Sequence, residues 1–208
     1  MTTAANAHDV ERARRVTHLR RTLLEAAPGS SVRLRGSLAR GTADAWSDID
    51  LSWNVDQGDD ALAALPHALR GVGPVESLRL DPDRAASSRL VFVRFHGWSL
   101  FQRVDIDVVG RFGPDTPSWA GARSSAESAL MNVVAALRAS HRGRGDVDGL
   151  VLRGFERVGG TDAGGATVRR LRRLIDASVA ADPAQAALAE RVRAEVRIAF
   201  DRGDDPSS

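Results

Sequence analysis

The hydrophobic period of this chain changes once, and that change constrains the fold more than any other feature. Up to about residue 110, short segments alternate apolar and polar residues, which is the period of β-strands. From Ser124 onward, apolar residues recur every three or four positions, as in amphipathic helices. The segment 110–121, GRFGPDTPSWAG, is rich in glycine and proline and predicts a linker. We therefore expect an α/β fold, with a small mixed sheet followed by a helical bundle.

The same patterns give the expected elements and boundaries. Strands are predicted over residues 31–37, 48–55, 75–80, 88–97 and 99–110. Helices are predicted over residues 10–27, 59–74, 124–145, 146–160, 164–181 and 182–203. We expect a first domain over residues 1–115, a helical domain over 116–203 and a disordered tail over 204–208.

The composition excludes several classes of chemistry. All 29 basic residues are arginine, so Schiff-base, lysine-nucleotidyl and P-loop lysine chemistry is ruled out. Cysteine is absent, which removes disulfides, thiol nucleophiles and thiolate zinc sites. The five histidines are scattered without ligand spacing. No apolar run reaches the roughly 18 residues of a membrane span, and the N-terminus lacks a secretory signal, so a cytoplasmic location is expected.

One segment, GSLARGTADAWSDIDL at residues 36–51, carries a candidate cation site. Asp48 and Asp50 are separated by one residue in a predicted strand, so both carboxylates point to the same side. Their Cα atoms are then roughly 6.5 to 7 Å apart, a spacing that holds one or two hard cations. Magnesium prefers oxygen ligands and completes its shell with water and substrate phosphates. The pair therefore predicts a magnesium site.

The same segment and a later strand supply the other parts of a phosphate-transfer site. Gly36 and Ser37 follow a predicted strand, where exposed N–H groups and a hydroxyl can bind phosphate. The later strand contains RVDIDVV, in which Asp105 and Asp107 share one face. A third carboxylate of this kind would bind the cation that activates the attacking hydroxyl, or accept its proton.

These motifs, together over about residues 32–109, resemble the nucleotidyltransferase superfamily typified by DNA polymerase beta. The string is most similar to its small bacterial branch, the minimal and aminoglycoside nucleotidyltransferases. The resemblance implies that Asp48 and Asp50 bind magnesium and that Gly36 and Ser37 bind the triphosphate. It also matches Arg40 to a basic position near the phosphates.

The resemblance leaves the third carboxylate open between two residues. The family pattern is an aspartate followed by apolar residues. Asp107, which precedes VVG, matches that pattern slightly better than Asp105 does. Both are kept as candidates, with Asp107 as the expected metal ligand.

The expected activity is magnesium-dependent transfer of a nucleoside monophosphate from an NTP, with ATP as the expected nucleotide, to an acceptor hydroxyl, releasing pyrophosphate. The acceptor is a small molecule such as an aminoglycoside, or a protein side chain. The alternative is a nucleotidyltransferase-like antitoxin or regulatory module that acts on a toxin-like partner protein. An enzyme acting on RNA ends is a third possibility and predicts a salt-sensitive complex. No second basic module is present to grip a duplex, so nucleic acid is not the expected partner.

Four features besides the candidate site residues each have two interpretations. The run 169–173, RRLRR, either contacts phosphate or forms a solvated helix face. Asn132 either lines an acceptor pocket or makes a hydrogen bond in the core. Trp46 either stacks on a base or packs its own loop. The arginines over 142–157 either meet an anionic ligand or form surface ion pairs.

Overall fold

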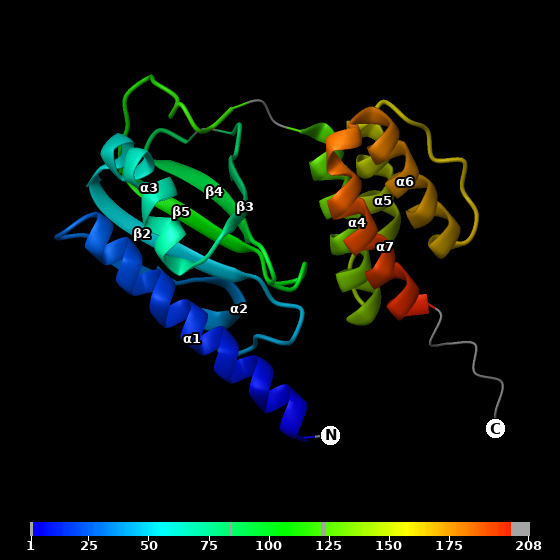
Figure 1. The fold of residues 1–208 in the computed structure, drawn as a ribbon, viewed down its shortest axis with the longest axis horizontal. Coiled ribbons are helices and arrows are strands. Elements are labelled where there is room, and N and C mark those ends of the chain that lie inside the picture. Colours follow the sequence, from blue (N-terminus) through cyan, green and yellow to red (C-terminus); the bar gives the residue numbers. More distant parts are fainter. Residues whose placement is uncertain (1, 84, 122–123, 201–208) are drawn as a thin grey trace. The chain divides into compact units, whose positions relative to one another are not determined.

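The computed structural model describes residues 2–83, 85–121 and 124–200 and divides the chain into two units, 1–122 and 123–208 (Figure 1). The first unit ends at residue 122, not at the expected residue 115, because Trp119 is hydrogen-bonded to a helix residue of this unit. Its indole Nε1 donates a hydrogen bond to the carbonyl of Leu62 at 2.8 Å. The expected tail over 204–208 lies outside the described residues.

The first unit is a five-stranded mixed sheet with helices. The strand order is β1-β2-β5-β4-β3, in which β2 and β5 are parallel and the other neighbours are antiparallel. This confirms the expected fold class. The elements are α1 Thr2–Ala26, β1 Ser31–Leu34, α2 Gly36–Ala39, β2 Ile49–Gln57, α3 Gly58–Val72, β3 Val75–Leu80, β4 Ser88–Phe95 and β5 Val104–Arg111.

Several boundaries differ from the expectation. Helix α1 begins at Thr2 and not at residue 10, and the helices expected to end at residues 145 and 160 end at His141 and Arg157. Two further differences have local reasons. β5 begins at Val104, not at residue 99, because the preceding residues form a turn in which the N–H of Gln102 bonds the carbonyl of Ser99 at 3.0 Å. The expected Gly-Ser turn is a short helix, α2. The N–H of Ala39 donates to the carbonyl of Arg35 at 3.2 Å, and the N–H of Gly41 donates to the carbonyl of Leu38 at 3.3 Å.

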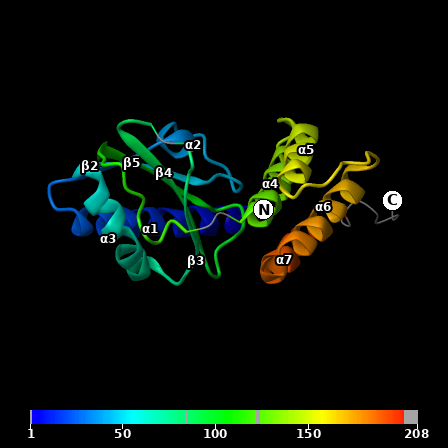
Figure 2. The same cartoon turned by 90° about the horizontal axis from the view of Figure 1, so that it is seen from above.

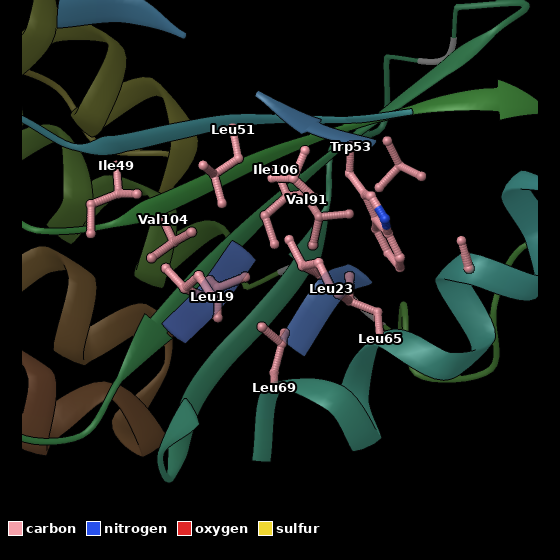
Figure 3. Close-up of a cluster of buried hydrophobic side chains, with 14 of the residues drawn as sticks. Leu19, Leu23, Ile49, Leu51, Trp53, Leu65, Leu69, Val91, Val104 and Ile106 are labelled. Atoms are coloured by element: carbon pink, nitrogen blue, oxygen red, sulfur yellow. The ribbon is translucent and has the colours of Figure 1, made fainter. Parts of the chain in front are cut away.

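Helices α1 and α3 cover one face of the sheet and enclose the core (Figure 3). Leu19 and Leu23 of α1 and Leu65 and Leu69 of α3 are fully buried against the apolar side chains of the central strands. Trp53 of β2 is also buried, and its Nε1 donates to Ser30 Oγ at 3.0 Å.

The opposite face of the sheet carries the polar residues of the same strands, and we call it the polar face. Along β2, buried Ile49, Leu51 and Trp53 alternate with the half-buried residues Asp50 and Ser52. The same alternation along β5 places Asp105 and Asp107 on the polar face. Burial of the apolar face therefore decides where the candidate carboxylates point.

The second unit contains the four expected helices, α4 Ser125–His141, α5 Val147–Arg157, α6 Thr167–Ala181 and α7 Ala186–Phe200, with a short 3-10 turn at Pro183–Gln185. α4 contacts each of the other three and lies beside α5 in Figure 2, and α6 also contacts α7. Asn132 of α4 donates to the carbonyl of Leu150 at 3.0 Å and accepts from Arg157 at 3.1 Å. It therefore makes hydrogen bonds between helices α4 and α5. In the part of the chain that the structure describes, no helix is long and apolar enough to cross a bilayer.

The arginine run of α6 contains a residue that anchors a loop. Arg170 donates to Asp162 through Nε at 2.9 Å and through Nη2 at 2.6 Å, and it also bonds Asp148. Asp162 accepts a further bond from the N–H of Gly164 at 3.0 Å, and its side chain is 8% exposed. Arg170 thus connects α6 to the segment that precedes it.

Replacing Asp162 with asparagine is expected to lower the free energy of unfolding by about 1–3 kcal/mol, the range for a buried group that loses a charged partner. The hydrogen bond from Arg170 lowers the pKa of Asp162, so the wild-type advantage is present above the ordinary carboxyl pKa and disappears as pH falls below it. Urea denaturation at several pH values measures this. A difference that grows in acid would contradict the assignment.

Candidate active site on the polar face of the sheet

The strand register brings Asp50 and Asp105 side by side. β2 and β5 are parallel neighbours, and these two residues are direct partners across the pair. Partners on adjacent strands lie about 4.8 Å apart and point to the same face. Asp107 is instead the partner of Ser52, one step further along the same face.

Asp48 completes the acidic group with these two residues. It immediately precedes β2, and the adjacent N–H of Ile49 bonds the carbonyl of Arg103 at 2.8 Å. Burial raises the pKa of Asp105 to about 6; the hydrogen bond and charge of Arg103 oppose this rise, and the charges of Asp48 and Asp50 add to it. The structure thus brings Asp48, Asp50 and Asp105 together, and we call these three the carboxylate cluster.

Asp107 has a different environment from the carboxylate cluster. It forms an ion pair with Arg35, the residue that follows β1. The side chain of Asp107 is 20% exposed and that of Arg35 is 52% exposed. Asp105 and Asp107, between which the sequence leaves the choice open with a slight preference for Asp107, therefore have different neighbours.

Gly36 lies against the Asp50 carboxylate. Its φ is +57°, a conformation that glycine adopts without steric cost. A Cβ at this position would lie 3.0 Å from Cγ of Asp50 and would overlap Oδ2. The N–H of the preceding Arg35 bonds the carbonyl of Asp50 at 2.8 Å. The absence of a side chain at Gly36 thus allows the α2 backbone and the Asp50 carboxylate to meet.

The other predicted phosphate residues lie on or just after the same turn. Ser37 is half-buried in α2, and its carbonyl accepts from the N–H of Thr42 at 2.9 Å. Arg40 caps the C-terminal end of α2 and is exposed.

The loop between α2 and β2 is held from several sides. Asp44 accepts hydrogen bonds from Ser47 Oγ at 2.8 Å and from the N–H of Trp46 at 3.1 Å. Its carbonyl accepts from Arg12, a buried arginine of α1. The Trp46 ring packs edge-on against Phe101, with centroids 4.7 Å apart. Trp46 therefore packs the loop against the turn that precedes β5.

Arg103 is a residue of this site that was not predicted from the sequence. Its Nε and Nη2 donate to the two carboxylate oxygens of Asp105, both at 2.6 Å. Its guanidinium also lies 4.5 Å from the ring centroid of Phe92, which is the partner of Asp105 on β4. Burial lowers the pKa of Arg103, but bonding to Asp105 and the charges of Asp48 and Asp50 raise it overall. The spacing of two residues before Asp105 was the available signal, because it places Arg103 on the same face.

The cluster fits a phosphate-bound magnesium ion better than a protein-only metal cage. Within residues 2–83, 85–121 and 124–200, no three His, Asp or Glu side chains are arranged to hold a metal ion. Magnesium, however, is usually held by one or two carboxylates together with waters and substrate phosphates. Asp48 and Asp50, with the backbone of Gly36 in close approach, match that requirement.

No family model and no curated protein matches this chain. Among solved structures it is similar to Cid1, described as having RNA terminal uridylyl transferase activity, with a TM-score of 0.40 and 18% identity over 65% of this chain and 40% of that chain. It is also similar to a cytoplasmic RNA terminal U-transferase, with a TM-score of 0.38 and 18% identity over 76% of this chain and 40% of that chain. A third similar structure is the polymerase core of TRAMP, an RNA surveillance complex, with a TM-score of 0.38 and 11% identity over 79% of this chain and 56% of that chain.

The chain spans about half or less of the length of these three proteins. All three names denote enzymes that transfer nucleotides. The identities are below 25% and the TM-scores are below 0.5. The activity of this chain is therefore inferred from the residues of its own site.

Proposed function

We propose that this chain is a magnesium-dependent nucleotidyltransferase of the DNA polymerase beta type, which transfers a nucleoside monophosphate from an NTP to an acceptor hydroxyl and releases pyrophosphate. The observation that carries the proposal is the contact between the α2 backbone at Gly36 and the carboxylate of Asp50. It joins a phosphate-binding turn to a cation-binding pair at one point of the polar face.

The proposed roles of the two aspartates and of the Gly-Ser turn follow from their positions. Asp48 and Asp50 would hold magnesium, and the N–H groups of Gly36 and Ser37 would bind the triphosphate, since the first N–H groups of a helical turn have no partner within it. When bound, magnesium neutralises the departing pyrophosphate and lowers the pKa of the attacking hydroxyl. The exposed Arg40 is placed to add positive charge beside α2.

Asp105 is the proposed third carboxylate, with Asp107 as the alternative. Asp105 is the direct partner of Asp50, whereas Asp107 pairs with Ser52 and with Arg35. A carboxyl with a pKa of about 6 is ionised at neutral pH and is basic enough to accept a proton from the hydroxyl.

Asp105→Asn is expected to reduce transfer by about 100-fold, within the 10²–10⁴ range of a positioned acid–base group. Asp107→Asn is expected to reduce it far less, because that residue faces Arg35. Parallel measurements of kcat and KM for both variants decide between them. A larger loss in Asp107→Asn would identify Asp107 as the third carboxylate.

The direct test is a transfer assay. The protein is incubated with each labelled NTP and magnesium, together with a panel of aminoglycosides, proteins and RNA, and with a chelator in a parallel series. Label on one acceptor class, lost with the chelator, is the expected result and identifies the acceptor. Transfer that persists fully in chelator would exclude the proposed chemistry.

A further inference from the structure

Arg103 already provides a positive charge to the carboxylate cluster. The guanidinium bonds both oxygens of Asp105 in a two-point geometry. It also interacts with the charges of Asp48 and Asp50. Arginine does not lose its proton in proteins, so this charge is permanent. The guanidinium of Arg103 therefore occupies both carboxylate oxygens of Asp105, the residue that lies beside Asp50.

The surroundings of Arg103 allow it to leave Asp105 without losing every partner. Its side chain is 23% exposed, and its guanidinium is already in contact with the face of Phe92. A cation over an aromatic ring is stabilised by about 0.5–1 kcal/mol at an exposed site and by more when desolvated. A bound triphosphate also offers oxygens in the geometry that a guanidinium binds at two points.

We infer that Arg103 competes with the divalent cation for Asp105, so that Asp105 becomes a metal ligand only when Arg103 moves off it. This rests on the proposed function and adds a control of metal loading to the same site. The bare protein binds metal through Asp48 and Asp50, while Arg103 holds Asp105. Nucleotide binding then favours release, because the phosphates give the guanidinium an alternative anion.

The test measures binding of Mn²⁺, without nucleotide, to the 208-residue chain by calorimetry or electron paramagnetic resonance. Arg103→Met is expected to bind Mn²⁺ about tenfold more tightly, an effect of the size typical for groups that orient metal ligands. Asp105→Asn in the wild-type background is expected not to tighten binding, because the guanidinium that it releases still acts on the charges of Asp48 and Asp50. The same substitution in the Arg103→Met background is expected to cancel the gain, because the added ligand is Asp105.

Arg79→Met is the matched control. Arg79 lies on β3 as the partner of Phe92, in the same row of the sheet as Asp105 but two strands away. The substitution removes the same charge near the same ring, so a general electrostatic effect would tighten Mn²⁺ binding in both variants. Competition for Asp105 predicts tightening in Arg103→Met alone.

Arg103→Lys gives a second measurement if Arg103→Met does not fold. Lysine keeps the charge but not the forked geometry, so its Kd is expected to lie between those of the wild type and of an unobstructed site. If both Arg103 variants bind Mn²⁺ as weakly as the wild type does, Arg103 does not compete for Asp105. If Arg103→Met does not fold, the same result in Arg103→Lys alone overturns the proposal. Failure of the proposed function looks different, because Mn²⁺ binding would then be absent, or would persist when Asp48 and Asp50 are both replaced.

Discussion

Replacing Asp48 and Asp50 together with asparagine is expected to abolish nucleotide transfer, by about 10³-fold or more, since loss of residues that merely support a metal ligand costs 10–100-fold. Asparagine keeps the size of each side chain but removes the negative charge that holds a hard cation. Asp50 lies on the polar face of β2 and Asp48 immediately precedes that strand, and neither belongs to the hydrophobic core. The thermal midpoint is therefore expected to stay close to that of the wild type. Measurements of labelled transfer and of Mn²⁺ binding should show both losses.

Asp56→Asn is the control for this double variant. Asp56 lies on the same strand, β2, where its exposed carboxylate pairs with exposed Arg111 at 2.8 Å. Exposed pairs contribute little to stability, so transfer and folding are expected to be unchanged. Equal transfer by the wild type and by the double variant would show that Asp48 and Asp50 do not bind the catalytic metal.

The second large effect is expected at Gly36. Its replacement by alanine would place a Cβ at 3.0 Å from Cγ of Asp50, so that carboxylate or the α2 backbone has to move. A displacement of about 1 Å within a catalytic geometry can cost about 100-fold in rate. We expect Gly36→Ala to lower kcat by at least that factor and to weaken Mn²⁺ binding. Single-turnover kinetics with saturating nucleotide measure the first effect.

Gly41→Ala separates steric overlap from backbone strain. Gly41 has a similar φ of +67°, but a Cβ there would meet nothing within 4 Å. Both variants carry the cost of a left-handed residue, about 1–2 kcal/mol. Only Gly36→Ala collides with Asp50, so only that variant is expected to lose transfer beyond the effect of stability. A similar loss in both variants would contradict the role of the Gly36 contact.

The sequence predicted the strands well because alternation is a local property. Burial of one face of the sheet forces apolar residues to every second position, and the DIDLSW and VDIDVV segments show this directly. The same reasoning correctly placed the aspartates on one face of each strand. It did not predict the start of β5, because the turn at Ser99 and Gln102 depends on individual hydrogen bonds.

The choice between Asp105 and Asp107 could not be made from alternation. The two residues are two positions apart, so they share a face whichever of them lies beside Asp50. The register between β2 and β5 separates them, and these strands are joined through α3, β3 and β4. Register depends on how the whole unit packs, which no local pattern contains.

The sequence by itself determined the order of the strands and of the longer helices, the polar face and the pairing of a Gly-Ser turn with two aspartates, because all of these follow from residue type and spacing. Only the tertiary structure decided which distant side chains meet. It brought Asp105 next to Asp50, turned Asp107 toward Arg35 and placed Arg103 on Asp105. The physical reason is that spacing along the chain selects a face, whereas strand register and packing select the neighbours on that face.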